Sequence, residues 1–314
     1  MPDYKVVHGA KVQNFASDPP APFIGQVWYN TTSATTKYFF VNPGAWSTVN
    51  GLNTSRTGIA GAGTITSALG FGGVPNDNGT LTELWNGTNW TEVNNLNTAN
   101  KFGGDAGASN TAALAFGGGG GDESLTETWN GTNWTEVNDL NTGRTYTAGC
   151  GTNTAALCFG GNPQLDNGGL VETWNGTNWT EVNDLSTKRN HPGGTGTQTA
   201  ALVFGGLVSS VTENTELWNG TNWTEVNNLT TARSYTVGAG ITTAALAFGG
   251  NGDTAKTELW NGTNWTEVND LNEGRQSHAG DGSQTAALSF GGSKPGGPTE
   301  EWNAGPTTST LGSE

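Results

Sequence analysis

The chain is built from a short sequence block that recurs along most of its length. The block reads Thr-Glu-x-Trp-Asn-Gly-Thr-Asn-Trp-Thr-Glu-Val-Asn, and its copies begin at Thr82, Thr126, Thr215 and Thr257, with Val171 opening a further copy. A period of about 40 to 50 residues is typical of arrays in which each repeat needs its neighbours to bury its apolar face, so the copies predict units stacked around one core. A second element, an apolar run ending in Phe-Gly-Gly, indicates six such units, with phenylalanines at Phe71, Phe116, Phe159, Phe204, Phe248 and Phe290.

Each unit is predicted to hold four short strands, which makes the chain all-β. Gly72 and Gly73 stop an apolar run, as expected where the backbone needs a positive φ or a close approach. Asn86-Gly87 is a strong hairpin signal, and alternation puts Trp85 and Trp90 on one face, where they can fill the wedge between neighbouring sheets. The strands expected in the first unit are residues 57–63, 66–71, 81–85 and 89–93. The tryptophans expected to fill wedges are Trp46, Trp85, Trp90, Trp129, Trp134, Trp174, Trp179, Trp218, Trp223, Trp260, Trp265 and Trp302.

The two ends of the chain are expected to complete one another. The sixth unit reaches Trp302 but lacks a second tryptophan strand. Residues 45–52 supply that piece, because Ala-Trp-Ser-Thr-Val-Asn-Gly-Leu there matches Asn-Trp-Thr-Glu-Val-Asn-Asn-Leu at residues 89–96. We therefore predict a six-bladed β-propeller of four-stranded blades whose last blade is closed by the N-terminal strand, which removes exposed sheet edges. Its units are residues 56–96, 100–140, 144–185, 189–229, 233–271 and 275–304.

Residues 1–43 and 305–314 stand outside the predicted propeller, which covers residues 44–304. In the N-terminal extension, residues 18–22 read as an extended Pro-rich linker, and residues 26–30 and 37–41 as a strand pair around a Thr-rich turn. We expect this extension to attach the propeller to something larger, and residues 305–314 to be a C-terminal tail.

The pattern within a unit resembles the Kelch repeat. The resemblance rests on paired glycines after an apolar strand, a pair of tryptophan strands and an arginine, which in the first unit are Phe71-Gly72-Gly73, Leu84-Trp85, Trp90 and Arg56. It covers residues 45–304 and implies a propeller of four-stranded blades. Kelch repeats usually carry a tyrosine where Trp85 stands, and Asn100-Lys101 replaces the arginine in the second unit. These departures argue against a typical cytoplasmic Kelch adaptor.

A shorter segment resembles a module of bacteriophage tail and fibre proteins, including marine ones. The segment reads Ile-Gly-Gln-Val-Trp-Tyr-Asn-Thr-Thr at residues 24–32, followed by Lys37-Tyr38 and Gly44-Ala45-Trp46. The resemblance implies a virion protein made in the host cytoplasm: a fibre, tail or capsid decoration subunit, attached to other virion proteins through its N-terminal segment. A host-surface glycan or protein is then the expected ligand, and a homo-oligomer is compatible with this role. The alternative is a free bacterial glycan-binding or protein-interaction propeller.

The charge of the chain argues against two classes of partner. Lys and Arg number 12 against 27 Asp and Glu, a formal net charge of −15, which repels phosphate backbones and anionic membranes. Residues 1–15 lack the apolar core of a secretory signal, so we expect neither export by the usual route nor a membrane partner. Cys150 and Cys158 occupy positions that are small in other units and, if they lie on adjacent hairpin strands, they are out of register for a disulfide.

Residue spacing gives no catalytic, cofactor or metal site, and we expect a protein that is not an enzyme. A copper-radical oxidase on a Kelch-type propeller needs a richer ligand set than His8, His191 and His278. Glycine runs such as residues 117–121 follow a strand without opening a helix, which favours loops over phosphate cradles. Three acidic turns offer calcium-type oxygens but read better as turns: Asp77-Asn78-Gly79, Asp166-Asn167-Gly168 and Asn251-Gly252-Asp253.

Variation among the repeats indicates where a ligand could bind. The hairpins between third and fourth strands are nearly identical, whereas the loop after Phe-Gly-Gly and the three residues after each arginine position differ. Both variable regions are expected on one face of a propeller, at the mouth of its channel, where aromatic, histidine and arginine side chains could stack on and hydrogen-bond a sugar or a peptide. The competing interpretation is that the arginines only brace the blade edges. The candidates are Arg56, Lys101, Phe102, Arg144, Tyr146, Arg189, His191, Arg233, Tyr235, Arg275 and His278.

Overall fold

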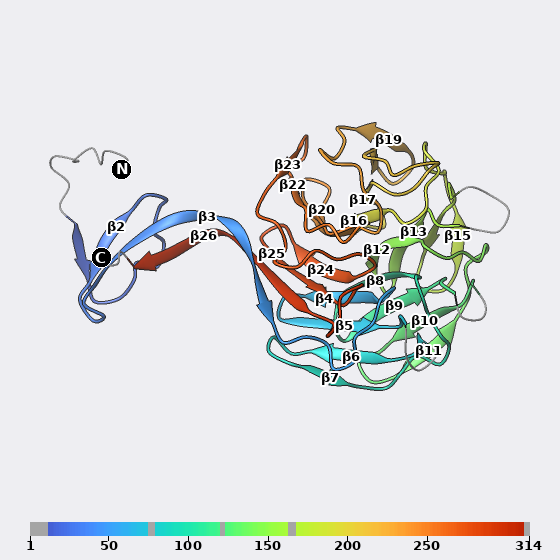
Figure 1. Cartoon of the computed structure of the whole chain (residues 1–314), viewed down its shortest axis with the longest axis horizontal. Helices are drawn as coiled ribbons and strands as arrows, with labels where there is room; N and C mark the ends of the chain where they lie inside the picture. Colours follow the sequence, from blue (N-terminus) through green and yellow to red (C-terminus); the bar gives the residue numbers. More distant parts are fainter. Residues whose placement is uncertain (1–11, 75–78, 120–122, 163–167, 311–314) are drawn as a thin grey trace. The chain divides into compact units, whose positions relative to one another are not determined.

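The computed structural model describes residues 12–74, 79–119, 123–162 and 168–310, and these residues form strands and turns without an α-helix. The chain divides into two compact units, residues 45–303 and residues 1–44 with 304–314. In the larger unit, repeated antiparallel sheets surround a centre, the arrangement of a β-propeller (Figure 1). No helix in these described ranges is long and apolar enough to cross a membrane.

In five sheets the strands follow chain order from the inner to the outer strand. Five sheets are four-stranded: β4 (Ala60–Thr64), β5 (Ser67–Phe71), β6 (Thr82–Trp85) and β7 (Trp90–Glu92); β8 (Gly104–Ser109), β9 (Ala112–Phe116), β10 (Thr126–Trp129) and β11 (Trp134–Val137); β12 (Ala148–Thr152), β13 (Ala155–Phe159), β14 (Val171–Trp174) and β15 (Trp179–Glu181); β16 (Gly193–Thr197), β17 (Ala200–Phe204), β18 (Thr215–Trp218) and β19 (Trp223–Val226); β20 (Val237–Ile241), β21 (Ala244–Phe248), β22 (Thr257–Trp260) and β23 (Trp265–Glu267).

The sixth sheet combines the two ends of the chain. Its order is β24-β25-β26-β3-β2-β1, with bounds β24 (Ala279–Ser283), β25 (Ala286–Phe290), β26 (Thr299–Thr310), β3 (Thr35–Val49), β2 (Val27–Asn30) and β1 (Gln13–Phe15). Inner strands of successive sheets contact one another, and β24 contacts β4. The stretch 45–49 of β3 thus lies beside β26, in the place that the outermost strand takes in the other sheets.

The turns within a unit follow from glycine and asparagine. Gly72 has a φ of 70°, and a Cβ there would lie 2.3 Å from the Asn100 carbonyl oxygen, so the predicted need for glycine after the apolar strand is confirmed. The hairpin at Asn86-Gly87 is longer than a two-residue turn, because Trp85 pairs with Trp90. The Asn86 Oδ1 atom closes this loop by accepting the backbone N–H groups of Thr88 and Asn89.

The first strand of a unit starts later than predicted. Residues 57–59 belong to no ladder strand: Thr57 forms an isolated bridge with Val74, and Gly58 adopts a φ of 64°. At the other end of the chain, residues 305–310 continue β26 instead of forming a separate tail, because β26 runs alongside β3. The strand pair around the Thr-rich turn is present, with Val27 opposite Tyr38 and Asn30 opposite Thr35.

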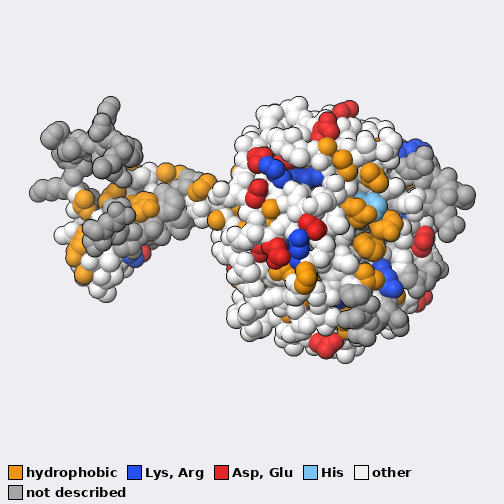
Figure 2. Space-filling model, in the orientation of Figure 1, with side chains coloured by type: hydrophobic (Ala, Val, Ile, Leu, Met, Phe, Trp, Pro, Cys, Tyr) orange, Lys and Arg blue, Asp and Glu red, His pale blue; other side chains and the backbone are white. Residues whose placement is uncertain are grey.

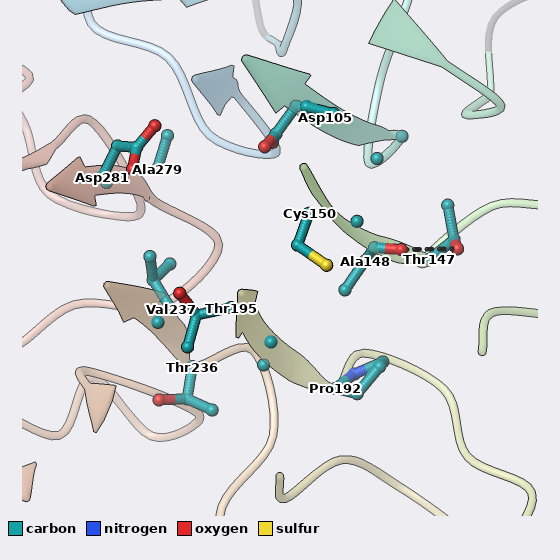
Figure 3. Close-up of a pocket in the computed structure, with 18 of the residues that line it drawn as sticks. Asp105, Thr147, Ala148, Cys150, Pro192, Thr195, Thr236, Val237, Ala279 and Asp281 are labelled. Atoms are coloured by element: carbon teal, nitrogen blue, oxygen red, sulfur yellow. Dashed lines mark hydrogen bonds between the residues drawn. The ribbon is translucent and has the colours of Figure 1, made fainter. Parts of the chain in front are cut away.

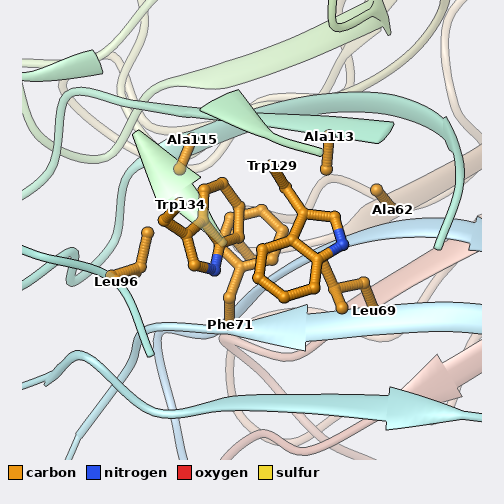
Figure 4. Close-up of a cluster of buried hydrophobic side chains, with 9 residues drawn as sticks. Ala62, Leu69, Phe71, Leu96, Ala113, Ala115, Trp129 and Trp134 are labelled. Carbon is orange, nitrogen blue, oxygen red and sulfur yellow. The ribbon is translucent and has the colours of Figure 1, made fainter. Parts of the chain in front are cut away.

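Aromatic side chains fill the wedges between neighbouring sheets. Between the first two sheets, Phe71 packs edge-on against Trp134, with ring centroids 4.8 Å apart, among Leu69, Trp129 and small alanines (Figure 4). The same contact recurs from sheet to sheet as Phe116–Trp179, Phe159–Trp223, Phe204–Trp265, Phe248–Trp46 and Phe290–Trp90. Edge-to-face pairs of this kind stabilise beyond their buried area. The tryptophans are therefore wedge fillers, as the sequence predicts.

One wedge tryptophan lacks a partner for its indole N–H. In other units this group donates to a threonine hydroxyl of the preceding sheet, as Trp179 does to Thr126 at 3.1 Å. Val171 stands at that threonine position for Trp223, whose Nε1 atom is buried with no partner. An unsatisfied buried donor costs stability, so this is a local defect of the repeat.

Replacing Val171 by threonine is expected to raise the free energy of unfolding by about 1 kcal/mol, because the new hydroxyl can accept the Trp223 N–H. Urea unfolding followed by tryptophan fluorescence measures the difference. The matched control, Thr126→Val, creates the same defect beside Trp179 and should cost about 1–3 kcal/mol. Destabilisation by both substitutions would contradict this account of the defect.

The cysteines are free and buried, as expected from register, because Cys150 lies opposite Leu157 and Cys158 opposite Gly149. Of the three acidic turns, Asp77, Asn78, Asp166 and Asn167 lie outside the described residues, as do His8, Gly120 and Gly121. The third turn is described. Its Asp253 accepts hydrogen bonds from Ser293 Oγ and from Lys294 Nζ, the latter at 3.2 Å, so its carboxylate is engaged by side chains.

Candidate ligand-binding site

The five arginines of the predicted binding face are buried. Each pairs with a glutamate of its own unit and is at most 1% exposed. In the fourth unit Arg189 Nη2 lies 2.5 Å from Glu216 Oε1, while Nη1 donates to the carbonyls of Gly205 and Asn214. The prediction that these side chains meet a ligand is therefore wrong, and the bracing interpretation holds. The pairs are Arg56–Glu83, Arg144–Glu172, Arg189–Glu216, Arg233–Glu258 and Arg275–Glu300.

The glutamate of each pair also ties two units together. Glu216 accepts the backbone N–H groups of Ser186 and Thr187, which belong to the link from the preceding unit. The second unit keeps the glutamate without the arginine. There Glu127 accepts a hydrogen bond from the Asn97 side chain at 2.8 Å, and Asn100 donates to the Gly117 carbonyl instead.

A ring of equivalent residues lies two positions after the arginines. Its members all have a left-handed φ between 52° and 64°. The backbone N–H of one member donates to the carbonyl of the preceding member, for example Tyr146 to Phe102 at 2.7 Å and Gly58 to Ser277 at 2.7 Å. In the described chain, the step from Ser277 to Tyr235 has no such bond. The ring members are Gly58, Phe102, Tyr146, His191, Tyr235 and Ser277.

Four consecutive ring members carry stacked side chains, which we call the aromatic row: Phe102, Tyr146, His191 and Tyr235. Ring centroids are 5.1 Å apart for Phe102 and Tyr146, 4.0 Å for Tyr146 and His191, and 3.9 Å for His191 and Tyr235. Burial between two tyrosines lowers the pKa of His191 to about 4, so its ring is neutral. Apolar side chains gather beside a histidine on the face seen in Figure 2.

The aromatic row opens onto a central cavity of about 190 Å³. The cavity is lined by the inner strands β8, β12, β16, β20 and β24, whose many glycines let these backbones approach one another. Two carboxylates stand out among these small residues, Asp105 on β8 and Asp281 on β24 (Figure 3). Within the described ranges no cluster of three or more His, Cys, Asp or Glu side chains could hold a metal.

The two carboxylates flank β4 and both contact its backbone. Asp281 Oδ2 accepts the Gly63 N–H at 2.7 Å, and Asp105 Oδ2 accepts the Gly61 N–H at 3.3 Å. Both residues are half-buried in the cavity wall, and this loss of hydration raises the pKa of each to about 7, with the charge of Asp281 adding to the effect on Asp105. The cavity therefore holds acids that titrate near neutral pH.

The predicted site residues separate into two groups. Phe102, Tyr146, His191, Tyr235 and His278 line the cavity, whereas the arginines and Lys101 do not. His278 is only 5% exposed and packs against Phe248, with ring centroids 5.7 Å apart. Sequence reasoning included Ser277 among the variable residues after the arginine positions but missed Asp105 and Asp281. The available signal was that each departs from what the repeat carries at the equivalent position.

Comparison with known proteins finds a likeness in fold to a solved structure and no likeness in sequence family. A solved structure titled "Structure of YjhT" is similar, with a TM-score of 0.64 and 12% sequence identity, over 83% of this chain and 96% of that one. At this identity the likeness is one of fold. No protein-family model and no curated protein matches the sequence.

Proposed function

We propose that the six sheets are the six blades of one closed propeller of Kelch-like type. Closure is supported by the wedge between the last and first sheets, where Phe290 packs on Trp90 at 4.8 Å and Trp90 Nε1 donates to Thr299. It is also supported by Trp46, which takes the position of the second tryptophan in the last blade. In a closed propeller each sheet packs against a neighbouring sheet on both of its faces.

We propose that this propeller is a non-enzymatic binding protein whose ligand is held at the mouth of the central cavity. The observation that carries the proposal is the aromatic row: stacked half-buried rings at the ends of the inner strands, held in a left-handed backbone conformation that is costly for such residues. Aromatic rings at a cavity mouth suit a sugar or a peptide side chain. Variation among the repeats is concentrated at these same positions.

We further propose that the chain is a structural subunit of a virus particle, in a tail, a fibre or the capsid decoration. Its support is the phage-like module at residues 24–32 and the large apolar side chains exposed in the smaller unit. Phe23 is 69% exposed and Ile24 is 60% exposed, which suits attachment to another protein. Neighbouring virion proteins are the expected partners of this unit, and a host-surface glycan or protein that of the propeller.

Mass spectrometry of purified particles is expected to find the chain at a stoichiometric level, together with known structural proteins. Host proteins carried along through purification serve as the background level. A chain at or below that background would overturn the virion role and leave a free binding propeller.

The double substitution Tyr146→Ala with His191→Ala is expected to lower binding of the purified chain to host cells at least tenfold, because it removes the centre of the aromatic row. Flow cytometry with labelled protein measures the binding. The control is Thr91→Ala with Glu92→Ala, which changes exposed side chains of the outer strand β7. Equal losses in both variants would contradict a binding role for the row.

A further inference from the structure

The ring at the cavity mouth has a gap beside Tyr235. One end of the aromatic row is covered, because Phe102 packs over Gly58, where a Cβ would lie 2.6 Å from Phe102 Cε1. At the other end, Ser277 takes a position that is aromatic or histidine in four units. Among the described residues, the backbone N–H of Ser277 also does not donate to the Tyr235 carbonyl, whereas each of the other ring members donates to the member before it. The outer face of Tyr235 therefore has only a small side chain next to it.

The two cavity carboxylates lie below this gap. Asp281 follows Ser277 by four residues on the same segment, and Asp105 follows Phe102 by three. Tyr235 and Ser277, which border the gap, line the same cavity as the two carboxylates. Figure 3 shows the two carboxylates directed toward one another from β8 and β24.

These carboxylates are not explained by the fold. The other units carry glycine at the position of Asp105 and alanine, cysteine or threonine at that of Asp281, and those units form the same strands. Withdrawing a carboxylate from bulk water is costly unless it is hydrogen-bonded or paired with a positive charge. No Lys or Arg lines the cavity. Asp281 accepts the Gly63 N–H at Oδ2 and the Gly282 N–H at Oδ1, whereas the Oδ1 atom of Asp105 has no hydrogen-bond partner among the described residues. An external cation would supply the missing partner.

We propose that the central cavity binds a primary ammonium group, which enters beside Ser277 and is held by the carboxylates of Asp105 and Asp281. The stem of the ligand then lies against Tyr235, where an aromatic ring also attracts a cation. A volume of about 190 Å³ fits a side-chain-sized group. The net charge of −15 attracts such a ligand from solution. The proposal rests on the proposed binding role of the cavity mouth and specifies its ligand as an amine.

The ammonium group can belong to a protein or to a glycan. Isothermal titration calorimetry on the full chain distinguishes these two kinds of ligand with four probes. The amines are Nα-acetyl-lysine amide, which stands for a protein ligand, and methyl glucosaminide, which stands for a glycan. Their neutral counterparts are Nα-acetyl-norleucine amide and methyl N-acetylglucosaminide. We expect at least one amine to bind at least tenfold more tightly than its neutral counterpart, and the amine that binds identifies the source. Absence of binding by both amines overturns the proposal.

Variants taken from the repeat itself test the residues. Asp281→Ala and Asp105→Gly introduce what other units carry, so we expect both proteins to fold, and each should weaken amine binding at least tenfold. Ser277→Tyr fills the gap with the ring found at Tyr146 and Tyr235 and should also block binding. Melting temperatures establish folding. Unchanged affinity in Asp281→Ala and Asp105→Gly overturns the proposal, whereas the cell-binding test of the aromatic row is unaffected by that result.

The pH dependence of binding gives an independent test. Burial raises the pKa of the Cys150 thiol and lowers those of His191 and His278, and it raises the pKa of Tyr235, so these groups stay neutral from about pH 6 to about pH 8. In that range the pKa values near 7 of Asp105 and Asp281 make the carboxylates ionise. The affinity for Nα-acetyl-lysine amide, whose ammonium group stays charged in this range, should therefore rise about tenfold from pH 6 to pH 8. An affinity that is flat or falls across this range contradicts the proposed carboxylate partners.

Discussion

Replacing Arg189 by alanine is expected to lower the free energy of unfolding by about 3–5 kcal/mol, because it leaves a buried glutamate without its positive partner. Glu216 is 1% exposed, and its remaining partners are the backbone N–H groups of Ser186 and Thr187. The substitution also frees the carbonyls of Gly205 and Asn214 from the guanidinium. Urea unfolding at neutral pH measures the loss.

A double substitution separates the charge from the packing. Arg189→Met with Glu216→Met removes both charges and keeps similar volume, and buried ion pairs replaced in this way often lose little stability. We expect the double variant to be more stable than Arg189→Ala alone. The second unit is the natural counterpart of Arg189→Ala, because Glu127 is buried there without an arginine and accepts the Asn97 side chain and the backbone N–H groups of Asn97 and Thr98. A loss below 1 kcal/mol in Arg189→Ala would show that the pair contributes little.

The repeat made most of the fold predictable. Near-identical copies locate the hairpins, and alternation places Trp85 beside Trp90, whose ring centroids are 5.4 Å apart. Matching residues 45–52 to residues 89–96 locates the strand beside β26. Strand ends were less predictable, because backbone bridges such as that of Thr57 with Val74 do not depend on side-chain type and so give no sequence pattern. The continuation of β26 past residue 304 was missed for a related reason, since its partner β3 is distant in sequence.

The candidate site was predictable in position but not in chemistry. Variation among units pointed to Phe102, Tyr146, His191 and Tyr235, which do form the row at the cavity mouth. The arginine interpretation failed because Arg56 and Glu83 are 27 residues apart, and only the folded sheet brings them together. Asp105 and Asp281 were missed because, in an acidic chain, single carboxylates are not conspicuous. Their significance follows from enclosure by glycine-rich strands around one cavity.

Replacing Trp46 by alanine is expected to cost about 3–5 kcal/mol of unfolding free energy, the usual effect of emptying a buried aromatic site. Trp46 is 5% exposed, packs against Phe248 with ring centroids 4.9 Å apart, and donates through Nε1 to the Thr257 hydroxyl at 3.0 Å. Trp134 has the same contacts inside a continuous stretch of chain, with Phe71 at 4.8 Å and Thr82 at 3.0 Å. Chemical unfolding of Trp46→Ala beside Trp134→Ala compares the two sites.

Equal losses are expected if the strand contributed by residues 45–52 is held as firmly as its counterparts within the repeat. A truncated chain beginning at residue 53 lacks this strand, exposes the edge of β26 and the wedge face of Phe248, and should aggregate or unfold. A chain beginning at residue 44 keeps the strand and should retain cooperative unfolding. Two results together would contradict this role: a much smaller loss in Trp46→Ala than in Trp134→Ala, and a chain beginning at residue 53 that stays soluble and equally stable. The propeller would then not depend on the strand at residues 45–52 for its closure, because removing that strand would not lower the stability of the rest of the chain.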